Sequence, residues 1–238
     1  MKKFLYILFL FPVLSGCDVA QQVLNDSTST SGGLTTADIV AGLKEALTVG
    51  TQNSSNKLSA VDGFFKDAAV KILMPPEAQK VENTLRNVGF GSVVDKAILT
   101  MNRGAEDAAK SATPIFVNAI KQMTITDALG ILKDGDNAAT NFFKEKTTAQ
   151  LIQAFRPVID QSLNKTDATK YWSDVFSVYN RFATNKVDTD LGAYVTGKAI
   201  DGIFYEVALE EQKIRKDPAA RVTQILQKVF GSKEAQGN

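Results

Sequence analysis

The sequence predicts an all-α protein with one multi-helix, bundle-like domain of about eight to ten helices. Apolar residues recur every three or four positions through most of the chain, as on the buried face of an amphipathic helix. Ser, Thr or Asp precedes several of these runs, and Gly or Pro follows them, which is typical of helix starts and stops. No segment alternates apolar and polar residues for long, and only AVKIL, at 69–73, suggests a short extended piece.

The first residues predict a lipoprotein signal peptide at 1–16. Lys2 and Lys3 precede an apolar run of about eleven residues, long enough for a secretory leader and too short to span a bilayer. Leu14-Ser15-Gly16-Cys17 then resembles the bacterial lipobox, and Cys17 is the only cysteine of the chain. The resemblance implies cleavage before Cys17 and lipid attachment to its thiol by diacylglyceryl and acyl groups such as palmitate. An ordinary signal peptide with a buried thiol is the alternative.

Residues 17–33 are expected to form an acylated N-terminus and a flexible linker, because NDSTSTSGG offers little apolar surface. The expected partner is membrane lipid, held through acylated Cys17. The localisation that follows is the bacterial cell envelope, at the inner or outer membrane, with the domain facing the periplasm. Asp26-Ser27-Thr28 resembles an O-glycosylation acceptor of some Bacteroidetes, and an unmodified linker is the alternative. The choice of membrane and the oligomeric state stay open.

The helical domain is predicted over residues 34–231. A cap at Thr35 precedes a first helix whose apolar residues are spaced by four. Pro76 can open a helix that ends near Gly89. The next helix has the clearest stripe, and its alanines would let a partner helix approach closely. The stripe consists of Val94, Ile98, Met101, Ala105, Ala108 and Ala112.

The second half of the chain gives further helices. Pro114 starts or kinks one, and Thr124 or Thr126 can cap the next, which Gly135 ends. A helix over 137–146 is followed by a separate one, capped by Thr147 or Thr148 and kinked at Pro157. The remaining predictions are an aromatic-rich helix at 171–182 with Trp172, Val175, Phe176, Tyr179 and Phe182 on one side, a long amphipathic helix at 191–215, a final helix opened by Asp217-Pro218 with Val222, Ile225, Leu226 and Val229 facing inward, and a disordered tail at 232–238.

Composition excludes several classes of site. The chain has no histidine, so Ser-His-Asp and Cys-His catalysis and the usual zinc ligand sets are unavailable, and no metal or other cofactor is expected. No glycine-rich phosphate-binding motif occurs. Net charge is +1 and becomes −1 when the two lysines of the leader are removed (+1 − 2), with no basic stripe, so nucleic acid is not an expected partner.

Seven short motifs together resemble one family over about 34–231. They are GLKEAL (42–47), MNRGAEDAA (101–109), PIF (114–116), TDALGIL (126–132), DGIF (201–204), EEQKIRKDPAAR (210–221) and KVFG (228–231). They look like the bacterial domain-of-unknown-function family 4197, which implies an envelope-associated helical domain and no known activity. The family usually has alanine where this chain has Gly104, which weakens the expectation of tight packing there.

The polar motif positions form either a site or a network that holds helices together. They are Asn102, Arg103, Glu106, Asp127, Asp201, Glu210 and Arg215. Arg103 with Asp107, and Glu211 with Arg215, are also spaced for surface ion pairs.

Three functions follow as hypotheses. The first is a lipid-anchored module that binds an envelope partner protein or an apolar ligand and has no catalytic residues. The second is a histidine-free, hydrolase-like enzyme in which the motif carboxylates and arginines converge in one cleft. The third is a purely structural envelope protein.

Overall fold

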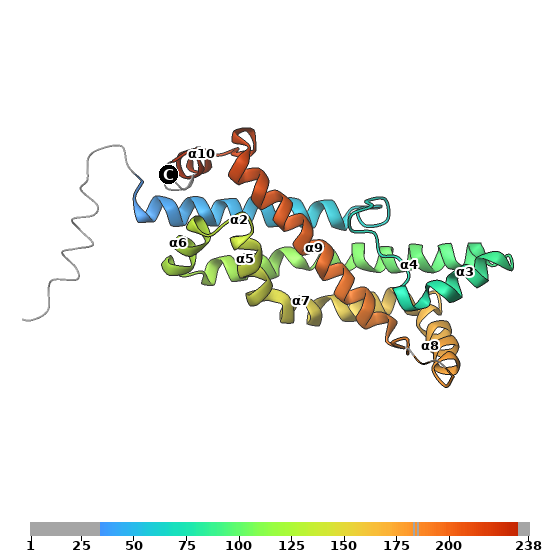
Figure 1. The fold of residues 1–238 in the computed structure, drawn as a ribbon. Helices are drawn as coiled ribbons and strands as arrows, with labels where there is room; N and C mark the ends of the chain where they lie inside the picture. The colour runs from blue at the N-terminus through green and yellow to red at the C-terminus, as the bar shows by residue number, and fades with distance from the viewer. Residues whose placement is uncertain (1–33, 183, 185, 233–238) are drawn as a thin grey trace, which may run out of the picture. The chain divides into compact units, whose positions relative to one another are not determined.

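The computed structural model describes residues 34–182, 184 and 186–232, and this part of the chain is helical and contains no strand (Figure 1). The all-α prediction is therefore confirmed. The predicted leader, Cys17, the linker up to residue 33 and the tail from 233 lie outside the described residues. The chain divides into two units, Met1–Thr35 and Thr36–Asn238, and the second is the helical unit.

Nine α-helices and two short 3₁₀-helices make up the described part of the helical unit. In order, they are α2 (Thr36–Ser59), η1 (Pro76–Ala78), α3 (Gln79–Asn87), α4 (Gly91–Ala109), α5 (Ala112–Gln122), α6 (Ile125–Lys133), α7 (Ala138–Asn164), α8 (Ala168–Tyr179), α9 (Leu191–Lys216), η2 (Pro218–Ala220) and α10 (Gln224–Phe230).

The core lies where α4, α7 and α9 pack against one another, and α2 packs against α4, α5, α6, α9 and α10 (Figure 1). The predicted stripe of α4 is buried throughout, and its last member, Ala112, is the first residue of α5. Phe116 and Phe143 are fully buried with ring centroids 5.1 Å apart in an edge-on contact. The buried apolar residues among those described all belong to the helical unit, which therefore has a hydrophobic core of its own, as an independently folding domain does.

Gly104 is a point of close packing, so the expectation of looser packing there is wrong. The residue is buried on α4, and a Cβ built on it would lie 3.3 Å from Cβ of Ser162 and 3.7 Å from Cα of Ile159, both on α7. The missing side chain lets the backbones of α4 and α7 approach each other.

Helix α7 is continuous from Ala138 to Asn164, so the predicted break before Thr147 and Thr148 is also wrong. Both hydroxyls donate to the carbonyl four residues earlier, at 2.6 Å, which removes their competition with the helical backbone. The helix also continues through Pro157. Burial of Phe143 and Leu151 on either side of the threonines favours one helix over two.

Helix starts agree with the sequence at Thr124 and differ near the C-terminus. Thr124 caps α6 in a reciprocal arrangement with Asp127. Asp217 and Pro218 open only the 3₁₀-helix η2, and Thr223 caps α10. Val222, predicted to face inward, therefore lies outside the last helix and is 69% exposed.

Within the described residues no single helix is both long and apolar enough to cross a bilayer. Helices α5 and α6 meet the length and composition test only as a pair, with a bend of 107° between them.

Candidate functional site

Asn102 fastens the connection between α2 and η1 (residues 60–75) to helix α4. Its fully buried amide accepts a hydrogen bond from the Ile72 N–H at 2.9 Å and donates to the Ile72 carbonyl at 2.8 Å. The same Nδ2 donates to the Ile98 carbonyl. Residues 68–70 form a turn, and the Asn102 amide satisfies both backbone groups of Ile72 just after it, where no strand lies alongside.

Glu106 lies one turn further along α4 and holds the start of the same connection. Its Oε1 accepts hydrogen bonds from the N–H groups of Phe64 and Phe65, at 3.2 and 3.1 Å. Its Oε2 accepts from Arg103, which also donates to Asp62 at 2.7 Å. These bonds, that to Glu106 first, raise the pKa of Arg103. Three motif residues of α4 thus serve one task, which is fixing the 60–75 connection.

Glu211 and Arg215 of α9 form a second buried cluster. The Glu211 carboxylate accepts from the N–H groups of Ala139 and Thr140, both at 2.9 Å, and from the Thr140 hydroxyl at 2.8 Å. It also accepts from Nη2 of Arg215 at 2.9 Å. A carboxylate beside the first turn of α7 satisfies free N–H groups and interacts favourably with the helix dipole.

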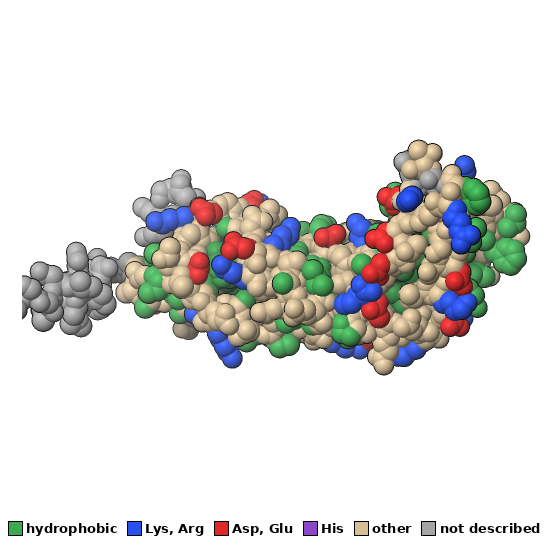
Figure 2. Space-filling view, turned by 90° about the horizontal axis from the view of Figure 1, so that it is seen from below, with side chains coloured by type: hydrophobic (Ala, Val, Ile, Leu, Met, Phe, Trp, Pro, Cys, Tyr) green, Lys and Arg blue, Asp and Glu red, His purple; other side chains and the backbone are tan. Residues whose placement is uncertain are grey.

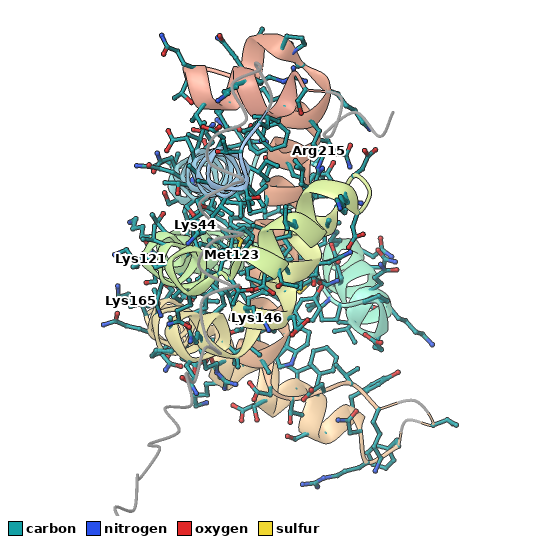
Figure 3. All side chains as sticks on the ribbon, turned by 90° about the vertical axis from the view of Figure 1, so that its left-hand side faces the viewer. Lys44, Lys121, Met123, Lys146, Lys165 and Arg215 are labelled. Carbon is teal, nitrogen blue, oxygen red and sulfur yellow. The ribbon has the colours of Figure 1, made fainter. Side chains whose placement is uncertain are left out.

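Arg215 does the complementary work at the other end of a helix. Its Nη2 donates to the Ile131 carbonyl at 2.6 Å, and Nη1 lies 3.4 Å from the Leu132 carbonyl, both in the last turn of α6. Figure 3 labels Arg215, which lies against the end of α6. Its side chain is only 11% exposed, so the predicted surface pair with Glu211 forms but is buried.

The other predicted surface pair does not form. Asp107 pairs with Lys110 instead, at 2.8 Å, because Arg103 is engaged by Glu106 and Asp62.

Two further motif acids are separate from both clusters. Asp201 is exposed on α9, 3.8 Å from Lys198. Glu210 accepts hydrogen bonds from Asn53 of α2 at 2.7 Å and from Lys213 at 3.2 Å.

Asp127 lies at the start of α6, where hydrogen bonds from the hydroxyl and backbone of Thr124 lower its pKa. It borders a cleft of about 290 Å³ between α5, α6 and α7, together with Lys146, which Figure 3 labels.

The seven motif residues therefore do not meet in one place. No hydrogen bond or ion pair in the described part of the chain joins Asp127, Asp201, Glu210, Arg215 and the three residues of α4 to one another across these groups. The convergent cleft that the enzyme hypothesis requires is not formed by them. No group of three or more His, Cys, Asp or Glu suited to a metal occurs among residues 34–182, 184 and 186–232.

A large apolar groove lies instead between α3, α4 and α8. Its volume is about 480 Å³, which falls in the range of small-ligand sites. Trp172 and Phe176 of α8 form part of its inner wall, with ring centroids 4.3 Å apart. The side chains that line its walls and mouth include Val81, Leu85, Val93, Ala97, Tyr171 and Val175.

The groove is open to solvent along an apolar rim. Tyr171 is 62% exposed and Val93 is 58% exposed. Phe90 at the α3–α4 corner and Phe182 just after α8 are also exposed, the latter to 86%. Hydrophobic side chains gather at the right-hand end of Figure 2, the end of the helical unit that holds α3 and α8. A cluster of this kind marks a binding surface more often than chance exposure does.

The connection that Asn102 fastens also supplies one wall of the groove. Met74 lines the groove two residues after Ile72. The carbonyl between them, on Leu73, accepts a hydrogen bond from the Tyr194 hydroxyl at 3.0 Å. The motif residue on α4 therefore positions groove residues without lining the groove itself.

Sequence reasoning missed the groove because it placed the aromatic residues of α8 on one side. Trp172 and Phe176 are buried, whereas Tyr171, Val175 and Val178 lie on an adjacent, exposed side of the helix, and Phe182 lies beyond the helix end. The sequence did show that α8 has apolar residues on two faces. Packing against the core can bury only one of them, so the other face was available to line a groove.

Comparisons with known proteins give a family and nothing finer. No curated protein and no solved structure matches the chain. A family model described as "Protein of unknown function (DUF4197)" matches residues 33–231. Because the match spans most of the chain and includes all the described helices, this protein belongs to the DUF4197 family.

Proposed function

We propose that this protein is a lipid-anchored envelope module that binds an apolar ligand in the groove between α3, α4 and α8. The observation that carries the proposal is the groove itself, about 480 Å³ and lined mostly by apolar side chains. Burial of a methylene group is worth ~0.8 kcal/mol. A ligand that buries ~8 methylenes would therefore gain ~6 kcal/mol, which corresponds to binding in the tens of micromolar range.

The position of the groove fits a tethered module. The helical unit begins at Thr36, at the end of α2 remote from α3 and α8 (Figure 1). Helix α2 has 24 residues and so spans about 36 Å. The groove therefore lies far from the point where the chain enters the helical unit.

The anchor is tested by the intact mass of protein recovered from membranes. We expect a chain that begins at acylated Cys17, with residues 1–16 removed. Recovery of an unmodified thiol, or of a chain that still begins at Met1, would contradict the anchor and leave the groove proposal intact.

Ligand binding can be read from Trp172, which is the only tryptophan and lines the groove. The protein is residues 17–238 with Cys17→Ser, so that no acyl group is present, and the probe is ω-bromoundecanol, whose bromine quenches a tryptophan on contact. We expect saturable quenching. Ala97→Phe, which places a ring in the groove, should weaken it at least about tenfold, as expected for a pocket that loses several methylene contacts.

Ala149→Phe is the matched control, because Ala149 is exposed on α7 and does not line the groove. It should leave the quenching unchanged. Linear, unsaturable quenching, or an equal loss in both variants, would refute the proposed function.

A further inference from the structure

We propose that the ligand of the groove is a single-chain amphiphile with an anionic head, and that Lys96 binds the head. This inference rests on the proposed function and specifies the chemical class of its ligand. It starts from the few polar side chains that interrupt the apolar lining, which are Glu82, Ser92, Lys96, Thr100 and Thr166.

Most of these polar groups already have partners within the protein. The Glu82 carboxylate accepts from Nε of Arg86 at 2.9 Å, and the same guanidinium binds Asp95 at 2.8 Å. The hydroxyls of Thr100 and Thr166 donate to the backbone carbonyls of Lys96 and Leu163, respectively. The Glu82 carboxylate at the groove wall is thus paired with an adjacent guanidinium, which it shares with Asp95 outside the groove.

Lys96 is different because it is exposed at the edge of the groove and its ammonium group makes no ion pair or hydrogen bond with any residue in the described ranges. Ser92 lies one turn before it on α4, and its hydroxyl also bonds to no described residue. Residues four apart on a helix lie side by side, so an ammonium and a hydroxyl stand next to each other along one wall of the groove. Together they offer donors to an anionic oxygen at the edge of an apolar site.

The alternative, a cationic head held by Asp95, is less favourable. Asp95 does not line the groove, its side chain is 67% exposed, and it is already paired with Arg86. A volume of about 480 Å³ also suits one alkyl chain.

The test compares three probes that share one alkyl chain and differ in the head: ω-bromoundecanoate, ω-bromoundecanol and the ω-bromoundecyl trimethylammonium ion. Quenching of Trp172 in residues 17–238 with Cys17→Ser reports binding. We expect the carboxylate to bind most tightly. Lys96→Gln should weaken the carboxylate about five- to tenfold, as expected when a charge-assisted hydrogen bond is lost, and the alcohol no more than about twofold.

Lys80→Gln is the matched control, since it removes the same charge from an exposed position on α3 that does not line the groove. It should leave the preference for the carboxylate unchanged, and thermal unfolding should show that both variants remain folded. Equal effects of the two lysine variants, or an unchanged preference in Lys96→Gln, would overturn the assignment.

The outcomes separate this inference from the function beneath it. If the alcohol binds and Ala97→Phe blocks it, but the carboxylate binds no tighter or the ammonium probe binds best, the anionic head is wrong and the proposed function stands. If none of the three probes quenches Trp172 saturably, both are wrong.

Discussion

Removing the carboxylate of Glu211 should destabilise the protein far more than removing the neighbouring carboxylate of Glu210. In Glu211→Ala, the N–H groups of Ala139 and Thr140 lose their acceptor. Arg215, whose side chain is 11% exposed, keeps its carbonyl partners but loses its counter-charge. The change therefore leaves an uncompensated charge and unsatisfied donors in the interior.

The expected size follows from these losses. Breaking a buried ion pair by removing one partner costs about 3–5 kcal/mol. A domain of this size has a total stability of about 5–15 kcal/mol, so a large part of it would be lost. The melting temperature should fall by about 10 °C, at roughly 2–4 °C per kcal/mol.

Urea unfolding followed by far-UV circular dichroism measures the effect. Glu210→Ala serves as the control, because that carboxylate bonds to Asn53 and Lys213 near the surface, and its loss should cost less than about 1 kcal/mol. Adding Arg215→Met to Glu211→Ala should restore part of the stability by removing the unpaired cation. Equal, small losses for both glutamates would refute the assignment of Glu211 and Arg215 as a buried clamp.

Three further predictions concern packing, the 60–75 connection and acid stability. Gly202→Ala should lower the free energy of unfolding by about 1–2 kcal/mol, because its Cβ would lie 2.6 Å from the buried ring of Phe64. Gly197→Ala, on the same helix with open space around it, should raise the free energy of unfolding by about 0.5–1 kcal/mol. Thermal unfolding that ranks the two variants the other way would contradict this packing. Asn102→Ala should cost about 2–4 kcal/mol and speed hydrogen exchange at the Ile72 amide, and unchanged exchange there would count against the fastening role. A hydrogen bond from Lys57 lowers the pKa of Asp67 below its ordinary 3.8. The stability that the ionised Asp67 carboxylate contributes is therefore present above pH 3.8 and is lost as the pH falls through its folded-state pKa. Asp67→Asn should reduce the fall in the urea midpoint below about pH 4, and an unchanged fall would argue against the ion pair between Lys57 and Asp67.

Local signals predicted much of the secondary structure. The stripe from Val94 to Ala112, the cap at Thr124 and the long helix from Leu191 depend on residues within a few turns of one another, and the structure agrees at each. The prediction of a helix break failed at Thr147 and Thr148, because a threonine can either cap a helix or lie inside one. Thr147 and Thr148 are good caps in isolation, but burial of the residues around them kept α7 intact.

For the candidate site, too, the sequence identified residues but not their contacts. The sequence singled out Asn102, Glu106 and Arg215 as polar positions, but it could not give their partners, which lie 30, 42 and 84 residues away at Ile72, Phe64 and Ile131. The groove was out of reach for the same reason, since α8, which closes it against the consecutive helices α3 and α4, comes after three further helices in the sequence.

By itself, the sequence determined the helical class, several helix limits and the place of a lone cysteine just after a short apolar run. Only the tertiary structure decided that the motif acids and arginines have separate partners and that α3, α4 and α8 leave an apolar groove between them. The physical reason is range: helix formation and capping depend on neighbours within about one turn, whereas burial and cavities depend on which distant surfaces meet.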